Sequence, residues 1–217
     1  INIVKKKMAE YGFPYKMTLD KHIHSRILVH ALDGVPTIAL RPNARFTLED
    51  LQGTLAHEID THLLRRQNAL QQPYKIFLSR FANYLPTEEG LAIINKEKVY
   101  KNPRRFDTSA LYVIATDLAL RSSFRDVYDK LVELGVYQQE KAWNMAFKVK
   151  RGMGDTSVPG SFTRYYLYFK GKKEVLDFIA RGGDVKQLYI GKIGIKDLKT
   201  IKKIANVNAP RFLPKNL

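Results

Sequence analysis

Hydrophobic residues in the first 44 positions follow the spacing of β structure. The runs Ile27-Leu28-Val29 and Thr37-Ile38-Ala39-Leu40 flank Asp33-Gly34, a dipeptide typical of a tight turn. Pro36 favours an edge of the sheet, because proline has no backbone N–H to donate to a neighbouring strand. This pattern predicts a small β-sheet near the N-terminus.

From position 45 onward the hydrophobic spacing changes to that of helices. Apolar residues recur every three or four positions from Leu48 to Leu63, which predicts a helix over 48–71. Thr47 precedes this helix as an N-cap, and acidic residues follow in its first turn. Further helices are predicted at 1–12, 76–85, from 86 onward, and at 105–121, 124–135, 138–150, 163–181 and 195–205.

These patterns predict a mainly helical α+β fold, with the small N-terminal sheet packed on the helix over 48–71. The chain has 217 residues, which is enough for one domain with a sizeable core. We therefore predict a single domain over 1–217. Its predicted parts are a β-containing part at 1–44, a helical part with a Gly- and Pro-rich loop at 45–181, and a C-terminal helical tail at 182–217.

The composition narrows the class of protein. Hydrophobic residues make up 45% of the chain, which argues for a globular protein and against disorder. Without cysteine there are no disulfides or thiolate metal sites, so a metal would need His and carboxylate ligands. No apolar run approaches the ~18 residues that span a membrane, and no signal peptide is visible. We expect a cytoplasmic protein without a membrane partner and, because the chain begins with Ile1, a processed product or an excised piece.

The net charge of +16 is large for this length and comes from lysines and arginines spread along the chain. Such a charge attracts anions, which include nucleic acids, acidic peptides and acidic membrane surfaces. A non-catalytic module that binds nucleic acid or an acidic protein is therefore the alternative function. No recognisable nucleic-acid-binding motif accompanies the charge.

The most informative motif is His57-Glu58-Ile59-Asp60-Thr61-His62, within the predicted helix over 48–71. Two imidazoles and a carboxylate can hold zinc and leave one coordination position for water. The metal lowers the pKa of that water and polarises a substrate carbonyl. Glu58 stands beside the first histidine, where its carboxylate can accept the proton of the water. The motif therefore predicts a hydrolytic zinc site.

The spacing of the two histidines carries a structural prediction. They are five residues apart, whereas the familiar zinc-protease motif places them four apart. Five residues of a regular α-helix rotate about 140° beyond one full turn, which would point the rings apart. A π-type turn is wider and would bring them together. We therefore predict a π-type distortion within 57–62; the alternative is that the histidines do not share a metal.

A carboxylate for the third ligand is present downstream, in the segment Thr87-Glu88-Glu89-Gly90-Leu91-Ala92. Either Glu88 or Glu89 could complete a site with three protein ligands. Acidic residues in the first turn of a helix also complement the helix dipole, and we expect this second role for one of the two. The residues alone leave the choice of ligand open.

Three separated motifs resemble the microtubule-associated tyrosine carboxypeptidase family. The similarity covers roughly 45–181 and implies a zincin-like metallopeptidase domain. Its eukaryotic members remove a C-terminal tyrosine from α-tubulin, and its bacterial members are named for a QEGLA motif. The matching motifs are HEIDTHLLRRQN, which begins at His57, TEEGLA, which begins at Thr87, and KRGMGDTSVPGSF, which begins at Lys150.

The resemblance assigns roles to residues of the site. It implies that His57 and His62 bind one zinc ion per chain and that Glu58 is the catalytic base. It also implies Glu89 as the third ligand, because the bacterial motif has Gln at the position before it. Eukaryotic members have glycine at the position of Asp60, whose carboxylate is expected to orient a histidine or to face solvent. Asn68, which also matches the family, is expected to make a structural hydrogen bond.

The resemblance further implies hydrolysis of the last peptide bond of a peptide or protein tail that ends in Tyr or Phe. The positive charge of the chain suits an acidic tail. Such an enzyme must bind a free carboxylate, and arginine offers a planar bidentate fork for it. Arg151 is the first candidate, because it lies in the third matched motif. The weaker substrate-binding candidates are Lys150, Arg164, Arg65, Thr156, Ser157, Tyr165 and Tyr166.

The leading prediction is therefore a zinc-dependent carboxypeptidase that uses a glutamate base. A zinc endopeptidase would differ from it by cleaving peptides with a blocked C-terminus. A regulatory protein with an inactive zinc site is a third alternative, and the presence of Glu58 argues against it.

Overall fold

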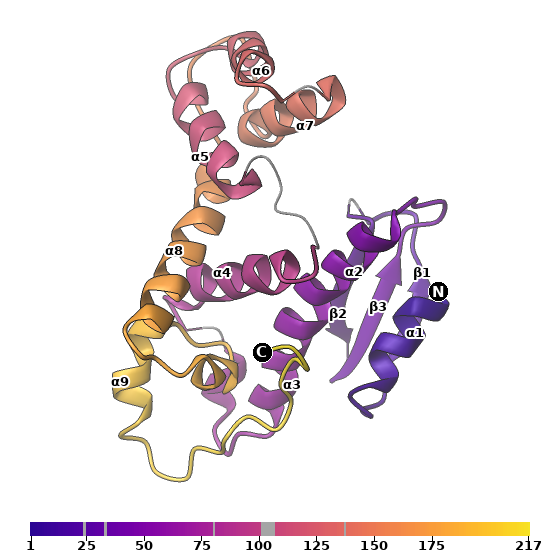
Figure 1. Ribbon diagram of the computed structural model, residues 1–217, viewed down its shortest axis with the longest axis vertical. Helices are drawn as coiled ribbons and strands as arrows, with labels where there is room; N and C mark the ends of the chain where they lie inside the picture. Colours follow the sequence, from indigo (N-terminus) through magenta and orange to yellow (C-terminus); the bar gives the residue numbers. More distant parts are fainter. Residues whose placement is uncertain (24, 33, 80, 101–106, 137) are drawn as a thin grey trace. The chain divides into compact units, whose positions relative to one another are not determined.

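The computed structural model describes residues 1–23, 25–32, 34–79, 81–100, 107–136 and 138–217. These residues are mainly helical with one small sheet, as the sequence predicts (Figure 1). They form two compact units: unit 1 comprises Ile1–Pro103 and Gly171–Leu217, and unit 2 comprises Arg104–Lys170. The units do not coincide with the parts predicted at 1–44, 45–181 and 182–217, and the single domain stays a prediction.

The sheet of unit 1 consists of β1 (Lys16–Leu19), β2 (Ile27–Leu32) and β3 (Val35–Leu40), in the order β1-β3-β2. β2 and β3 are antiparallel, which confirms the predicted strand pairing, and Asp33 of the predicted turn lies outside the described residues. β1 runs parallel to β3. The expectation that Pro36 lies in an edge strand is wrong, because β3 is the central strand. β1 pairs with β3 only from Thr37 onward, so the missing N–H of Pro36 disturbs no pairing with β1.

The helix that carries the histidines shares a core with the sheet. Thr47 caps α2 (Leu48–His57) by accepting the N–H of Asp50, as predicted. The helix continues as η1 (Glu58–Leu63) and α3 (Leu64–Leu70). Side chains of α1 (Asn2–Ala9), the sheet, α2 and η1 form one buried cluster, and each buried aliphatic side chain contributes about 1.5–3 kcal/mol. The buried members are Val4, Met8, Ile27, Ile38, Leu55, Ile59 and Leu63.

Helix α4 (Tyr84–Glu97) lies beside α2 and crosses α8 (Tyr166–Ala180) at a pair of glycines (Figure 1). A Cβ atom on Gly90 would lie 2.3 Å from backbone atoms of Gly171. One on Gly171 would lie 1.9 Å from the carbonyl oxygen of Pro86. The two backbones can approach this closely only because both residues lack a side chain. Gly90 thereby determines how deeply α4 packs, directly after its two glutamates.

The helix predicted at 76–85 is only the short 3₁₀ turn η2 (Lys75–Leu78). The backbone after this turn pairs with a distant segment instead of continuing the helix. The N–H of Lys192 donates to Phe77, and the carbonyl of Lys192 accepts the N–H of Phe81. These long-range bonds compete with the local helix and outweigh the apolar pattern.

The C-terminal part of the chain packs into unit 1 and contains only short helical elements. Asn68 exchanges two hydrogen bonds with the backbone of Phe212, at 2.7 and 2.8 Å, which confirms its structural role. The guanidinium of Arg65 is buried and donates to the carbonyls of Leu188 and Ile193. The elements are η4 (Val185–Tyr189), η5 (Ile195–Asp197) and α9 (Leu198–Ile201).

Unit 2 is a continuous stretch of the chain with a core of its own. A capping box between Ser123 and Asp126 starts one of its helices. Buried side chains such as Leu111, Leu131 and Met145 fill its centre. The predicted helices at 105–121, 124–135 and 138–150 are confirmed over the described residues. The elements are α5 (Thr108–Ala119), α6 (Phe124–Glu133), α7 (Gln139–Lys150), η3 (Thr163–Tyr165) and the first turn of α8.

Candidate metal centre

The helix distortion predicted from the histidine spacing is confirmed. The segment η1 is π-helical over Glu58–Leu63, in direct continuation of α2. The hydroxyl of Thr61 donates to the carbonyl of Ala56, five residues earlier, at 3.4 Å. The imidazole rings of His57 and His62 consequently meet, with centroids 5.0 Å apart and planes inclined by 70°. The wider turn therefore places both rings on one side of the helix.

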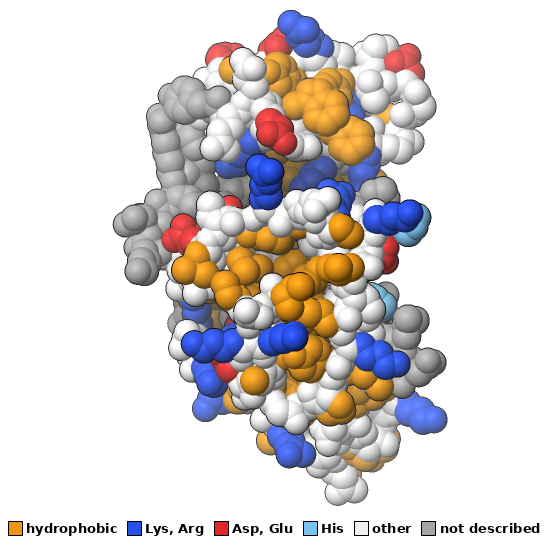
Figure 2. All heavy atoms as spheres, turned by 90° about the vertical axis from the view of Figure 1, so that its right-hand side faces the viewer, with side chains coloured by type: hydrophobic (Ala, Val, Ile, Leu, Met, Phe, Trp, Pro, Cys, Tyr) orange, Lys and Arg blue, Asp and Glu red, His pale blue; other side chains and the backbone are white. Residues whose placement is uncertain are grey.

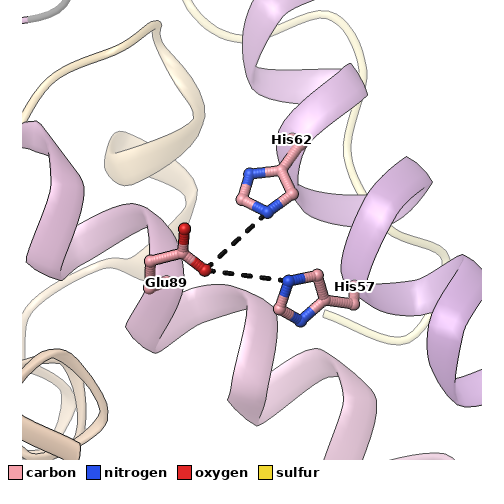
Figure 3. A group of neighbouring side chains, drawn as sticks. All are labelled: His57, His62 and Glu89. Atoms are coloured by element: carbon pink, nitrogen blue, oxygen red, sulfur yellow. Dashed lines mark ion pairs between the residues drawn. The ribbon is translucent and has the colours of Figure 1, made fainter. Parts of the chain in front are cut away.

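Glu89 of α4 faces both imidazoles. Its Oε2 atom lies 3.7 Å from Nε2 of His57 and 3.9 Å from Nε2 of His62. Figure 3 shows the three side chains pointing toward one another from two neighbouring helices. One ligand atom from each residue lies within 4.8 Å of the other two. The structure therefore brings together the three residues that the resemblance names as ligands.

The donor set and its geometry fit a zinc ion. Two imidazole nitrogens and one carboxylate oxygen are a common ligand set of catalytic zinc, which keeps a further position open. Tetrahedral bonds of about 2.0–2.2 Å put ligand atoms roughly 3.3–3.6 Å apart, slightly closer than the two distances seen here. A small inward movement of the side chains would close them on an ion. Among the described residues, His57, His62 and Glu89 form the group with metal-binding geometry.

The two glutamates lie deeper in their helix than the sequence suggests. Because α4 begins at Tyr84, Glu88 and Glu89 lie in its second turn, and the expectation that one of them complements the helix dipole in the first turn is wrong. Both are buried, with 3% and 7% of their surface exposed. Consecutive helical residues point about 100° apart, so the two carboxylates reach different atoms. The structure thus gives Glu88 and Glu89 different surroundings.

Glu88 contacts the other nitrogen of His62. Its Oε1 atom lies 3.1 Å from Nδ1 of His62 and 4.0 Å from Nη1 of Arg65, and it also pairs with Nζ of Lys192. Lys192 additionally donates to the backbone carbonyl of His62, at 3.2 Å. Burial would raise the pKa of Glu88, but Lys192, His62 and Arg65 outweigh burial and hold that pKa below its usual value. Glu88 is therefore a carboxylate at neutral pH.

Burial and neighbouring charges also shift the pKa values of His57 and Glu58. Burial lowers the pKa of His57 well below its usual value, and the charges of His62 and Lys96 act in the same direction. A neutral imidazole has a lone pair for a metal. Burial also raises the pKa of Glu58, with further contributions from Glu89 and Glu88. A raised pKa brings a carboxylate closer to the range in which general bases work best.

Asp60 has neither of the two surroundings expected for it. Only 8% of its surface is exposed, so it does not face solvent. Its carboxylate accepts the hydroxyl of Tyr11 at 2.5 Å and pairs with Nζ of Lys7 at 2.9 Å, rather than with a histidine. The residue therefore fastens the π-helical segment to the N-terminal part of the chain.

The predicted substrate residues other than Arg65 belong to unit 2, whereas the metal centre belongs to unit 1. Arg151 is exposed, and its guanidinium lies 4.3 Å from the ring centre of Phe162 and 5.5 Å from that of Tyr165. The ammonium of Lys150 is buried among backbone carbonyls, and Arg65 is likewise fully buried. Both cations therefore have structural partners in place of an open surface.

The remaining candidates lie on or beside the loop after α7. The hydroxyl of Ser157 donates to Asp155 at 2.6 Å, and the carbonyl of Thr156 accepts the N–H of Phe124. Arg164 is exposed. The ring of Tyr165 stacks on Tyr112 with centroids 4.8 Å apart, and Lys170 lies 6.0 Å from the ring centre of Tyr166. Their roles toward a substrate stay predictions.

Sequence reasoning missed Lys192 as a member of the site. It is an isolated lysine in a strongly basic chain and lies 104 residues from Glu88 in sequence. Arg65 was considered only as a carboxylate-binding cation. No local pattern marks either residue, because their positions result from packing between distant segments.

The surface supplies two further observations. No helix in the described parts of the chain is long and apolar enough to cross a bilayer. On the face drawn in Figure 2, Lys and Arg side chains lie among hydrophobic and other side chains.

Comparisons with known proteins show the family to which the whole chain is similar. The sequence profile described as "Microtubule-associated tyrosine carboxypeptidase" matches residues 1–217. MATCAP2 of Mus musculus is 31% identical over 97% of this chain and 42% of its own length. Microtubule-associated tyrosine carboxypeptidase 1 is 31% identical in Rattus norvegicus and 28% identical in Homo sapiens, in each case over 98% of this chain. Those matches cover 47% and 46% of the two relatives, so the chain spans less than half of their length.

Proposed function

Because this chain belongs to the microtubule-associated tyrosine carboxypeptidase family, we propose that it forms the catalytic part of a zinc-dependent carboxypeptidase that releases a C-terminal Tyr or Phe. The observation that carries this proposal is the convergence of His57, His62 and Glu89 within 4.8 Å, with Glu58 next to the first ligand. The fold around this site is proposed to be zincin-like. The π-helical turn adapts the five-residue histidine spacing to the same chemistry.

In the proposed mechanism, His57, His62 and Glu89 hold the metal. When bound, zinc supplies a Lewis acid that polarises the scissile carbonyl and acidifies a water molecule. Glu58 accepts the proton of that water and later delivers it to the leaving amine. Burial raises the pKa of Glu58, which makes its carboxylate a stronger acceptor for the proton of the water.

The proposed substrate is a peptide or protein tail with a free terminal carboxylate. The names of the relatives refer to microtubules and to tyrosine, so a tubulin tail is the first protein substrate to test, and we place the enzyme in the cytoplasm with it. The net charge of +16 favours an acidic tail by long-range attraction. Arg151 remains our proposal for the terminal carboxylate, because its exposed guanidinium can form a bidentate pair.

The first experiment compares matched peptides. Zinc-loaded protein is incubated with acidic peptides that end in Tyr, Phe or Ala, each with a free or an amidated C-terminus, and the released amino acid is measured. We expect release of Tyr and Phe only from the free acids, loss of release with a chelator, and recovery with added zinc. Equal cleavage of the amidated peptides would indicate an endopeptidase. No cleavage of any peptide or tubulin tail by the folded, zinc-loaded protein would contradict the proposal.

A second experiment tests Arg151. Arg151→Ala should raise KM for free-acid peptides by roughly tenfold, because a hydrogen bond to a charged group contributes about 1.5–3 kcal/mol. Arg125→Ala is the matched control, since Arg125 is exposed and pairs with Asp129 on the surface of unit 2. An unchanged KM in the folded Arg151 variant would remove this residue from the proposed substrate site.

A further inference from the structure

Glu88 is the most heavily engaged carboxylate beside the metal centre. Three positively polarised groups surround it, and each comes from a different segment of unit 1: His62 from η1, Arg65 from α3 and Lys192 from the stretch after η4. Only 3% of the residue is exposed. A buried carboxylate with this many partners is costly to assemble, so its position calls for an explanation.

We propose that Glu88 is a positioning residue, which orients the imidazole of His62 for the metal and is itself held by Lys192. This inference rests on the proposed metal centre and extends it by a second carboxylate with a different task. Glu88 accepts the Nδ1–H of His62 at 3.1 Å, so that Nε2 presents its lone pair on the side of Glu89. Metal-binding histidines generally use such a partner to fix the tautomer and the ring orientation.

The charge of Glu88 has a second effect on the centre. Arg65 is fully buried and the side chain of Lys192 is 13% exposed, and both cations lie close to the site, so an ion with two positive charges would be repelled by both. The carboxylate of Glu88 lies between these cations and the imidazole, so it compensates their charge locally. A glutamine at this position could still accept the hydrogen bond from His62, but it could not provide this compensation.

Backbone hydrogen bonds fix the position of Lys192, which can therefore hold the carboxylate of Glu88 in place. The N–H of Lys192 donates to the carbonyl of Phe77 at 2.9 Å, and its own carbonyl accepts the N–H of Phe81 at 3.1 Å. Its ammonium bonds both the carboxylate of Glu88 and the backbone carbonyl of His62. The same side chain therefore contacts the ligand's helix and the ligand's orienting partner. The C-terminal part of the chain thereby contributes, through Lys192, to the orientation of His62.

The test measures metal affinity and ligand geometry independently of catalysis. Zinc affinity is determined by competition with a chromophoric chelator, and the visible spectrum of the cobalt-substituted protein reports the coordination geometry. The variants are Glu88→Ala, Glu88→Gln, Lys192→Met and the double variant Glu88→Gln/Lys192→Met. The matched control is Lys172→Met, because Lys172 forms a more exposed pair with Glu97 of α4, at 2.8 Å. The melting temperature of the metal-free proteins reports folding.

We expect Glu88→Ala to weaken zinc binding by about 10–100-fold and to shift the cobalt spectrum, as is typical when the partner of a ligating histidine is lost. Glu88→Gln and Lys192→Met should each weaken binding less, and their losses should not add in the double variant, because they remove the same ion pair. Lys172→Met should match the wild type. If Glu88→Ala fails to fold, the Gln and Met variants carry the test.

Two outcomes separate this inference from the function on which it rests. A folded wild type that binds no zinc would contradict the proposed metal centre itself. A wild type that binds zinc, together with folded Glu88→Gln and Lys192→Met variants of unchanged affinity and unchanged cobalt spectrum, would overturn the positioning role alone.

Discussion

Units 1 and 2 both bury cationic side chains, and the partners of these cations differ. In unit 1, Lys192 and Arg65 approach the carboxylate of Glu88, which in turn contacts a candidate metal ligand. In unit 2, Lys150 has no exposed surface and donates to three backbone carbonyls, those of Ala119, Ser122 and Val158, at 2.6–3.0 Å. Within the described residues, no carboxylate lies at ion-pair distance from Lys150.

This difference in partners distinguishes a cation with a structural role from cations that belong to the candidate metal centre. Backbone carbonyls satisfy the three donors of Lys150 and fasten the loop after α7 to the end of α5, so this charge needs no ligand. Burial lowers the pKa of Lys150, whereas unit 1 uses its cations to lower the pKa of a carboxylate. A buried cation paired with a carboxylate that also contacts a histidine therefore points to function more strongly than burial alone.

The two units also differ in how the chain assembles them. Unit 2 is one continuous stretch, Arg104–Lys170, whereas unit 1 joins Ile1–Pro103 with Gly171–Leu217. The centre in unit 1 consequently depends on contacts between residues more than 100 positions apart, such as Glu88 with Lys192. Changes in unit 1 are expected to affect the metal, and changes in unit 2 to affect local stability.

The largest expected effect is the loss of the metal from unit 1. Glu89→Ala and His57→Ala each remove one of three ligands, so we expect zinc content per chain, measured by mass spectrometry, to fall from about one to near zero. Asp155→Ala in unit 2 removes an exposed carboxylate that accepts the N–H and the hydroxyl of Ser157, and it should leave the zinc content unchanged. Full zinc content in both ligand variants would exclude this centre.

The next effect separates catalysis from metal binding. Glu58→Gln should lower kcat by about 10²–10⁴-fold, the usual contribution of a general base, while zinc content stays at the wild-type value. The measurement is release of Tyr from a free-acid peptide under saturating conditions. Wild-type turnover in this variant would remove Glu58 from the base role and leave the metal centre intact.

A smaller effect tests the close crossing of α4 and α8. Gly90→Ala places a Cβ atom 2.3 Å from the backbone of Gly171, so the helices must separate and the free energy of unfolding should fall by about 3 kcal/mol. Zinc binding should weaken as well, because Glu88 and Glu89 move with α4. Gly154→Ala in unit 2 is the control, since its Cβ would meet nothing within 4 Å. Equal stability of the two variants in urea unfolding would contradict the tight crossing.

The smallest expected effect tests whether Lys150 of unit 2 has a different role from Lys192 of unit 1. Lys150→Met leaves three carbonyls without their donor, so the free energy of unfolding should fall by about 1–2 kcal/mol and the loop at 151–162 should become more sensitive to proteases. Zinc affinity should not change. A loss of zinc affinity comparable to that of Lys192→Met would mean that the two cations do not have separate roles.

Local patterns predicted the local structure well. The antiparallel pairing of β2 with β3, the cap at Thr47 and the π-helical turn each depend on residues close in sequence, and all three are confirmed. The predictions for Pro36 and for the helix at 76–85 failed where a distant strand or Lys192 supplied the backbone partners. The expectation for Asp60 failed for the same reason, because its partners Lys7 and Tyr11 come from the N-terminal part of the chain.

The sequence by itself determined the chemistry available to this protein: two histidines with the spacing of a π-type turn, a glutamate beside the first, and two glutamates followed by a glycine. This arrangement can be predicted from the sequence because helical periodicity depends only on neighbouring residues. The tertiary structure alone decided that Glu89 faces both Nε2 atoms while Glu88 contacts Nδ1 of His62. It also placed Lys192 there, because packing between distant segments determines which side chains meet and leaves no periodic pattern in the chain.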